Sequence, residues 1–212
     1  MPTNLAIKKR RGGRGLYPYK DKSQQITRYK ALPEYLTQQE VETLIRCTPH
    51  AIARLLMLEQ WRAGLRVSEA LALTRADLHI DIDTDNPTLQ VRHGKGNKAR
   101  VVPVHPELAV ALTNYLAYSP RKPQDEPLIQ VSRLAAYLWV RKAYDKAVSL
   151  DMMPPGRRIS THTLRHSAAR HWLMYGTRIN VVQLWLGHSN LSSTLIYLRI
   201  LPDPEGQMNQ IP

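Results

Sequence analysis

The sequence contains four separated segments whose side chains are suited to holding and cutting a phosphodiester. In the first, Arg66 lies at a glycine-marked junction just before a predicted helix, which carries Glu69 one turn later. A guanidinium can hold two phosphate oxygens in a bidentate fork, and the Glu69 carboxylate would keep it in place. Taken alone, an arginine and a glutamate at this spacing are more often a surface ion pair.

The second segment, residues 94–98 (GKGNK), contains glycines as a phosphate-binding loop does. No Gly-Lys-Ser/Thr follows and the next element is a predicted strand, so a nucleotide-binding P-loop is not indicated. A lysine at the tip of a hairpin, such as Lys95, can reach into a DNA groove and donate a proton to a departing sugar oxygen. A solvated lysine turn is the competing interpretation.

The third segment pairs His162 with Arg165 at the start of a predicted helix. The two side chains lie one turn apart, so both can face the same phosphate. His162 and His166, at i and i+4, have the spacing of two metal ligands, but the glutamate of a zincin motif and a third ligand are missing. We therefore expect no metal here.

The fourth segment, residues 186–190 (LGHSN), precedes Tyr197, which follows His188 by nine residues. On a helix, one stripe of leucines would be buried and Tyr197 would point away from it, leaving its hydroxyl available for chemistry. A tyrosine taken alone is far more often structural. The leucines of the expected stripe are Leu191, Leu195 and Leu198.

The elements that must position these groups are mostly helical. Thr37 with Glu40 predicts a capping box that opens a helix ending near Cys47. Two segments rich in β-branched residues, 88–92 and 99–104, flank the GKGNK turn and predict a hairpin. The fold class expected is mainly α with a small antiparallel β-sheet (α+β). The other predicted helices are 51–63, a short one after Arg66, 106–118, 132–149, 163–175, 179–186 and 192–198.

Composition points to a polyanionic partner. Lysine and arginine number 30 against 17 acidic residues, so the formal net charge is +13. Nucleic acid is favoured over an anionic membrane surface. The single cysteine, Cys47, excludes an intramolecular disulfide and a cysteine-based zinc cluster and fits a reducing cytoplasmic compartment, at the nucleoid if the partner is DNA. No apolar run approaches the roughly 18 residues of a spanning helix.

The positive charge is concentrated near the N-terminus. Residues 1–31 carry nine basic side chains against one acidic residue, Asp21, a net +8 of the total +13. Three glycines and few apolar residues predict a flexible arm that follows a phosphate backbone, with a solubilising tail as the alternative. The basic residues expected to contact DNA are Lys8, Lys9, Arg10, Arg11 and Arg14 in the arm and Lys98 and Arg100 at the hairpin.

Taken together and in this order, GLRVSEA, GKGNKARVVPV, HTLRH, LGHSN and the final tyrosine resemble the catalytic domain of the tyrosine recombinases, the phage integrase family. Lys98 is the alternative to Lys95 for the family's hairpin lysine, and Lys95 is preferred because it lies between the two glycines. The catalytic residues that the resemblance implies are Arg66, Lys95, His162, Arg165, His188 and Tyr197.

The resemblance implies transesterification without cofactor, metal or ATP. Tyr197 attacks a scissile phosphate, giving a 3′-phosphotyrosyl link and a free 5′-hydroxyl, and a second strand later reverses the step. The two arginines stabilise charge on the non-bridging oxygens, the two histidines hydrogen-bond those oxygens, and Lys95 protonates the leaving 5′ oxygen. His162 is expected to help take the proton of Tyr197, and the nearby guanidiniums to favour its phenolate.

Many family members grip DNA as a clamp, with a helical core-binding domain ahead of the catalytic domain. Here we expect a flexible basic arm (1–31), a catalytic domain (32–200) and a short tail (201–212). The chain is then a minimal recombinase similar to the small fimbrial inversion enzymes, a fragment, or a protein that relies on an accessory DNA-binding protein. Prolines and a glycine in the tail disfavour the exchanged C-terminal helix of the family, although a homo-oligomer, dimer or tetramer, on double-stranded DNA is expected.

Two rival functions stay open beside a site-specific recombinase. A type IB topoisomerase-like enzyme would use the same chemistry without sequence choice or strand exchange. A non-catalytic DNA-binding regulator would keep only the fold, and the intact set of six groups speaks against it, because a decayed enzyme would be free to lose them.

If the basic arm replaces part of the clamp, deleting residues 1–30 will weaken DNA binding and flatten its salt dependence, because fewer phosphate counterions are released on binding. Titrations of duplex DNA at several salt concentrations measure both. Unchanged affinity and slope would show that the arm only solubilises the chain.

Overall fold

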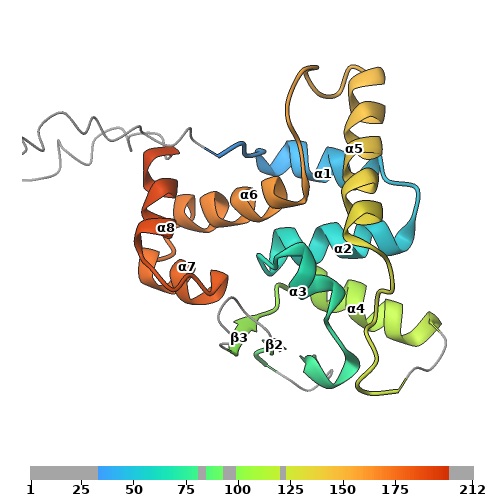
Figure 1. Ribbon diagram of the computed structural model, residues 1–212, viewed down its shortest axis with the longest axis vertical. Helices are drawn as coiled ribbons and strands as arrows, with labels where there is room; N and C mark the ends of the chain where they lie inside the picture. The colour runs from blue at the N-terminus through green and yellow to red at the C-terminus, as the bar shows by residue number, and fades with distance from the viewer. Residues whose placement is uncertain (1–32, 81–84, 93–98, 120–122, 201–212) are drawn as a thin grey trace, which may run out of the picture. The chain divides into compact units, whose positions relative to one another are not determined.

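The computed structural model describes residues 33–80, 85–92, 99–119 and 123–200, which form helices and one small antiparallel sheet (Figure 1). The α+β class expected from the sequence is confirmed. The basic arm, Lys95, Lys98 and the tail lie outside the described residues. Within these ranges no helix combines the length and the apolar character needed to cross a membrane.

The elements are α1 (Gln38–Arg46), α2 (Ala51–Arg62), α3 (Val67–Leu71), η2 (Arg75–Asp77), β1 (Leu78–His79), β2 (Thr88–Val91), β3 (Arg100–Pro103), α4 (Pro106–Tyr118), α5 (Arg133–Ser149), α6 (Thr161–Met174), α7 (Ile179–Leu186), α8 (Ser192–Leu195) and η3 (Ile196–Ile200).

Side-chain caps explain where several helices begin. At α1, Thr37 and Glu40 form the expected capping box, in which each side chain accepts from the other's backbone N–H. Helix α6 begins two residues before the position expected from sequence, because Ser160 and Thr163 form a second box. Helices α4 and α7 have the predicted bounds. The caps therefore place the first turn of α6, which carries predicted site residues.

The sheet has the order β1-β2-β3, with both pairings antiparallel. The hairpin of β2 and β3 is confirmed, and Leu89 lies opposite Val102 on the buried face. Val101, the next residue, is exposed, as the two-residue period of a strand requires. The two-residue strand β1 was not predicted, because it is too short to show alternation.

Helix α2 lies at the centre of the described fold and packs against α1, α3, α4, α5 and α6; Figure 1 shows it between α6 and α4. Every residue from Leu55 to Trp61 is buried, so the helix faces core on all sides. Its leucines join a cluster with the sheet and α4, whereas Met57 and Trp61 join another with α1, α5 and α6. The helix thereby holds the sheet and α6, which carry site residues, to one core.

The C-terminal segment differs from the prediction. Leu191, Leu195 and Leu198 are about two-fifths exposed, whereas Tyr197 is 1% exposed, so the expected leucine stripe and the outward-pointing tyrosine are both wrong. The chain passes from the single turn of α8 into the 3-10 turn η3, in which residues three apart eclipse each other. Thr194 and Tyr197 have this spacing and are both buried. Tyr197 packs in a third cluster with Ala169, Val182 and Leu186.

Gly64 allows Trp172 of α6 to pack closely against the backbone between α2 and α3. Its φ is +61°, and an added Cβ would lie 2.6 Å from Cη2 of Trp172 on α6. Gly156 also has a positive φ, +83°, but an added Cβ there meets nothing within 4 Å. A side chain at Gly156 would therefore cause backbone strain alone, whereas a side chain at Gly64 would also clash with Trp172.

We expect Gly156→Ala to lower the free energy of unfolding by about 1 kcal/mol through backbone strain alone. Gly64→Ala should cost about 1–3 kcal/mol more, because Trp172 must move. Urea unfolding of the two variants and the parent measures the difference. Equal losses would show that the core around Trp172 yields without cost.

Candidate functional site

A buried carboxylate, Glu69, gathers three arginines. Its side chain is 2% exposed and accepts hydrogen bonds from Nη1 of Arg66 at 2.7 Å and from Nη1 and Nη2 of Arg100 at 2.9 and 2.8 Å. Nη1 of Arg165 approaches at 3.3 Å. The backbone N–H of Arg66 also donates to Glu69, at 2.8 Å. The expectation that Glu69 holds Arg66 is confirmed, and the carboxylate additionally joins α3, β3 and α6.

Arg165 lies almost wholly inside the protein. Its side chain is 4% exposed, and Nη1 donates to the carbonyl oxygen of Gly64 at 2.6 Å while Nη2 donates to that of Leu186. These carbonyls belong to the GLR and LGH segments, which the sequence places far apart. One guanidinium thus joins two of the predicted motifs.

Arg100 does not support its expected role as a DNA contact. Its Nε donates to the carbonyl oxygen of Trp185 at 2.7 Å, and both terminal nitrogens bind Glu69. With 5% of the side chain exposed, the guanidinium has its donors turned inward. The position next to the predicted turn favoured DNA contact, but the long side chain reaches back from β3 into the site.

The arginine cluster is positive overall, because three guanidiniums face one carboxylate. Burial raises the pKa of Glu69, but the hydrogen bonds and charges of Arg100, Arg66 and Arg165 outweigh it and hold this pKa at about 2. Burial, followed by the charge of Arg66, lowers the pKa of Arg165. Arg66 is the most exposed of the three, at 21%. An anion beside Arg66 would relieve this excess of positive charge.

His162 lies exposed on the first turn of α6, one turn before Arg165. Partial burial of its ring, then the charges of Arg165 and Arg66, lower the pKa of His162, which favours the neutral imidazole at neutral pH. His162 therefore faces the arginine cluster as a neutral hydrogen-bonding group.

The described residues include no group of three histidine, cysteine, aspartate or glutamate side chains arranged to hold a metal ion.

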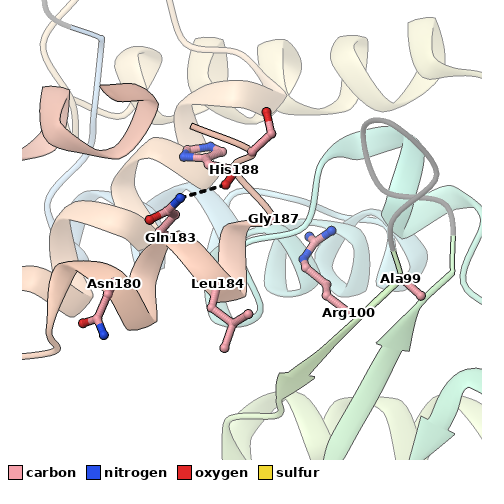
Figure 2. A pocket seen from close by; sticks show the side chains of 8 residues that line it. Ala99, Arg100, Asn180, Gln183, Leu184, Gly187 and His188 are labelled. Carbon is pink, nitrogen blue, oxygen red and sulfur yellow. Dashed lines mark hydrogen bonds between the residues drawn. The ribbon is translucent and has the colours of Figure 1, made fainter. Parts of the chain in front are cut away.

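His188 is oriented by the turn between α7 and α8. Its Nδ1 lies 2.9 Å from the hydroxyl of buried Thr194, and its carbonyl oxygen accepts from Gln183 at 3.1 Å (Figure 2). Gly187 precedes it with φ +64°, and a Cβ there would lie 2.9 Å from Nη1 of Arg100. Burial, then the charges of Arg165 and Arg66, lower the pKa of His188 to about 4. Its ring is therefore neutral and fixed at one edge.

Tyr197 is enclosed by this set of groups. Its hydroxyl lies 2.8 Å from Nδ1 of His166, and its ring lies nearly parallel to that of His188, at 17° and 6.4 Å between centroids. Burial raises the pKa of Tyr197, whereas the charges of Arg165 and Arg66 lower it by less. The guanidiniums lower the pKa of Tyr197 as expected, but burial raises it by more. The expectation that the phenolate is favoured is therefore wrong for this arrangement.

The structure brings five of the six predicted catalytic residues into one region, while Lys95 lies outside the described residues. Sequence reasoning missed the partners of the two inner groups, namely His166 for Tyr197 and Thr194 for His188. His166 is part of the HTLRH motif, but its spacing from His162 suggested only a metal site and no contact with Tyr197. No sequence pattern pointed to Thr194, because its contact with His188 depends on the turn between α7 and α8.

Replacing Glu69 with glutamine should destabilise the protein by about 3–5 kcal/mol at pH 7, because Arg100 and Arg165 would stay buried without their counter-charge. The folded-state pKa of Glu69, about 2, lies below its unfolded value, so its stabilisation is present above pH 4.5 and disappears as the pH falls towards 2. Urea unfolding of parent and variant at pH 7, 5 and 3 measures this. A difference that stays constant down to pH 3 would contradict the assignment.

Comparison with known proteins agrees with this geometry. The model of the phage integrase family matches residues 34–203. Tyrosine recombinase XerA of Pyrococcus horikoshii is 34% identical over 180 residues, which cover 81% of this chain and 58% of that protein. The chain thus spans about three fifths of the length of the curated relatives it matches first.

Solved structures show the same likeness. A crystal structure of XerA recombinase matches with a TM-score of 0.68 and 25% identity, over 85% of this chain and 66% of that one. The catalytic domain of bacteriophage HP1 integrase matches in fold with a TM-score of 0.58 and 22% identity, over 84% of this chain and 95% of that one. The chain therefore belongs to the phage integrase family, the tyrosine recombinases.

Proposed function

We propose that the chain is a site-specific DNA recombinase of the integrase or invertase type, which cuts and rejoins DNA through a 3′-phosphotyrosyl intermediate on Tyr197. The observation that carries the proposal is the placement of the Tyr197 hydroxyl against α6, the helix that also carries His162 and Arg165. A nucleophile and two groups able to bind a phosphate thus share one wall of the site. Hydrogen-bonded positioning of this kind is the usual arrangement of an activated nucleophile.

In this proposal the arginines bind the scissile phosphate. Arg66 offers its exposed edge to a non-bridging oxygen while Glu69 holds the other side of the guanidinium. Arg165, fixed by two carbonyls, contributes its charge from below. Groups held in place before the reaction stabilise charge that develops in the transition state without reorganisation, an effect of about 3–4 kcal/mol for one donor.

The histidines and Lys95 complete the proposed set. His162 and His188 are neutral and can donate a ring N–H to the phosphate oxygens. Lys95 would protonate the 5′ oxygen as it leaves. Because Tyr197 is 1% exposed, the side chains that cover its hydroxyl have to move aside when DNA binds. The energy of the broken phosphodiester is kept in the phosphotyrosyl link, so the cycle needs no ATP.

The proposal extends to the assembly on DNA. Exchange of strands between two duplexes needs more than one nucleophile, so we propose that the chain acts as a homo-oligomer at double-stranded DNA of the nucleoid. Residues 1–31 would serve as its basic DNA-binding arm, beside a catalytic domain of residues 32–200 and a tail of residues 201–212. An accessory DNA-binding protein is compatible with this arrangement.

A nicked suicide duplex tests the chemistry, because cleavage beside the nick releases a short strand and traps the enzyme on DNA. We expect a protein–DNA adduct on a denaturing gel with duplexes built from inverted repeats beside the gene, or with a pool of nicked duplexes of random sequence. Tyr197→Phe should abolish the adduct. Tyr175→Phe, which alters a tyrosine that is 74% exposed, is the matched control and should retain it.

The products separate the rival functions. Joined recombinant strands support a recombinase, whereas relaxation of supercoiled DNA without recombinants indicates a topoisomerase-like enzyme. Retained DNA binding with no adduct on any duplex would favour a non-catalytic regulator and overturn the proposal.

A further inference from the structure

His166 makes the one direct hydrogen bond to the Tyr197 hydroxyl among the described residues. Its Nδ1 lies 2.8 Å from the phenol oxygen, and the two rings are tilted by 51° with centroids 5.7 Å apart. The two rings are therefore joined through the hydrogen bond and are not stacked. His166 directly follows Arg165 on α6, so the helix that holds a phosphate-binding arginine also holds the phenol.

The other two histidines are placed for different contacts. His162 is exposed at the start of α6, and its ring centroid lies 6.4 Å from that of His166. His188 has its Nδ1 engaged with Thr194 and lies nearly parallel to the tyrosine ring. Neither makes a hydrogen bond to the phenol oxygen within the described part of the chain. His166 is therefore the histidine in position to accept its proton.

We propose that His166 is a catalytic residue that holds the Tyr197 hydroxyl through Nδ1 and takes its proton as the oxygen attacks the phosphate. This inference rests on the proposed recombinase function. The O–H bond breaks and an N–H bond forms on Nδ1, while the phenol oxygen bonds to phosphorus and the bond to the 5′ oxygen breaks. The leaving oxygen takes a proton from Lys95. In the reverse step the imidazolium returns its proton to the tyrosine oxygen.

The surroundings of His166 keep it neutral until substrate arrives. His162 and Arg165 face it from its own helix, His188 from the turn after α7, and Tyr197 from η3. Burial, then the charges of His162 and Arg165, lower the pKa of His166 to about 4. A bound phosphate would offset the charge of Arg165 and favour the imidazolium. The phosphate that Tyr197 attacks would therefore make His166 a stronger base.

The proposal requires one tautomer of His166. Nδ1 must be bare to accept the phenol proton, so the ring proton has to lie on Nε2. The described residues provide no hydrogen-bond partner for Nε2, and the ring can carry its proton there. If the proton lay on Nδ1, His166 would donate to the phenol oxygen and could not act as its base.

Nitrogen-15 NMR of the histidine side chains tests the tautomer without any reaction. We expect a bare Nδ1 for His166 in the full chain at pH 7, with a shift that changes in Tyr197→Phe. A protonated Nδ1 overturns the inference whatever the outcome of the DNA assays.

Adduct formation on the nicked duplex used by the parent protein tests the proton transfer. His166→Asn keeps an acceptor oxygen near the position of Nδ1 but cannot take a proton, and we expect its rate to fall about 10²- to 10³-fold with DNA binding unchanged. His171→Asn, a histidine of the same helix that packs on Trp61 and Tyr175, is the matched control and should retain the parent rate.

Chemical rescue separates proton transfer from structure. Imidazoles added to His166→Ala should restore the rate, and the more basic ones should restore it more. A duplex with sulfur in place of the leaving 5′ oxygen should rescue Lys95→Ala but not His166→Asn, because sulfur leaves without a proton. If His166→Asn forms the adduct at the parent rate, or if rescue does not depend on the basicity of the imidazole, the inference about His166 is overturned while the proposed function stands. If the parent protein forms no adduct, the proposed function itself is overturned.

Discussion

The carboxylate of Glu69 is the contact on which the arrangement of the site depends. It lies beneath the surface and accepts hydrogen bonds from arginines on three separate elements, the α3 junction, β3 and α6. Each guanidinium would be costly to bury alone, and together they would repel one another. A single negative charge makes their proximity possible, yet leaves the cluster positive. The same contact therefore stabilises the fold and prepares a site for an anion.

Tyr197, the proposed nucleophile, is held by a second set of contacts, which work against its ionisation. His166 and His188 each engage one hydroxyl of the C-terminal segment, those of Tyr197 and Thr194. Burial raises the pKa of the phenol more than Arg165 and Arg66 lower it. The tyrosine is thus neutral and covered. His166 is already placed to accept the phenol proton, and a phosphate bound to the arginines would favour the transfer.

Two glycines determine how closely these parts meet. Gly64 lets Trp172 pack against the backbone beside Arg66, and Gly187 lets Arg100 pass beneath the turn that carries His188. Both have a positive φ, where a side chain would add backbone strain to a steric conflict. In the GLR and LGH segments alike, a glycine therefore permits a close approach beside a backbone carbonyl, that of Gly64 or Leu186, that accepts from Arg165.

The sequence by itself determined the helices with clear caps, the hairpin, the α+β class and the family resemblance, because these depend on local spacing and on the order of short motifs. It also placed Glu69 beside Arg66, since that contact is local. Only the tertiary structure decided that Tyr197 is buried, that His166 is its partner and that Arg100 turns inward to Glu69. These contacts join residues 31 positions apart, and the periodicity of one helix carries no information about them.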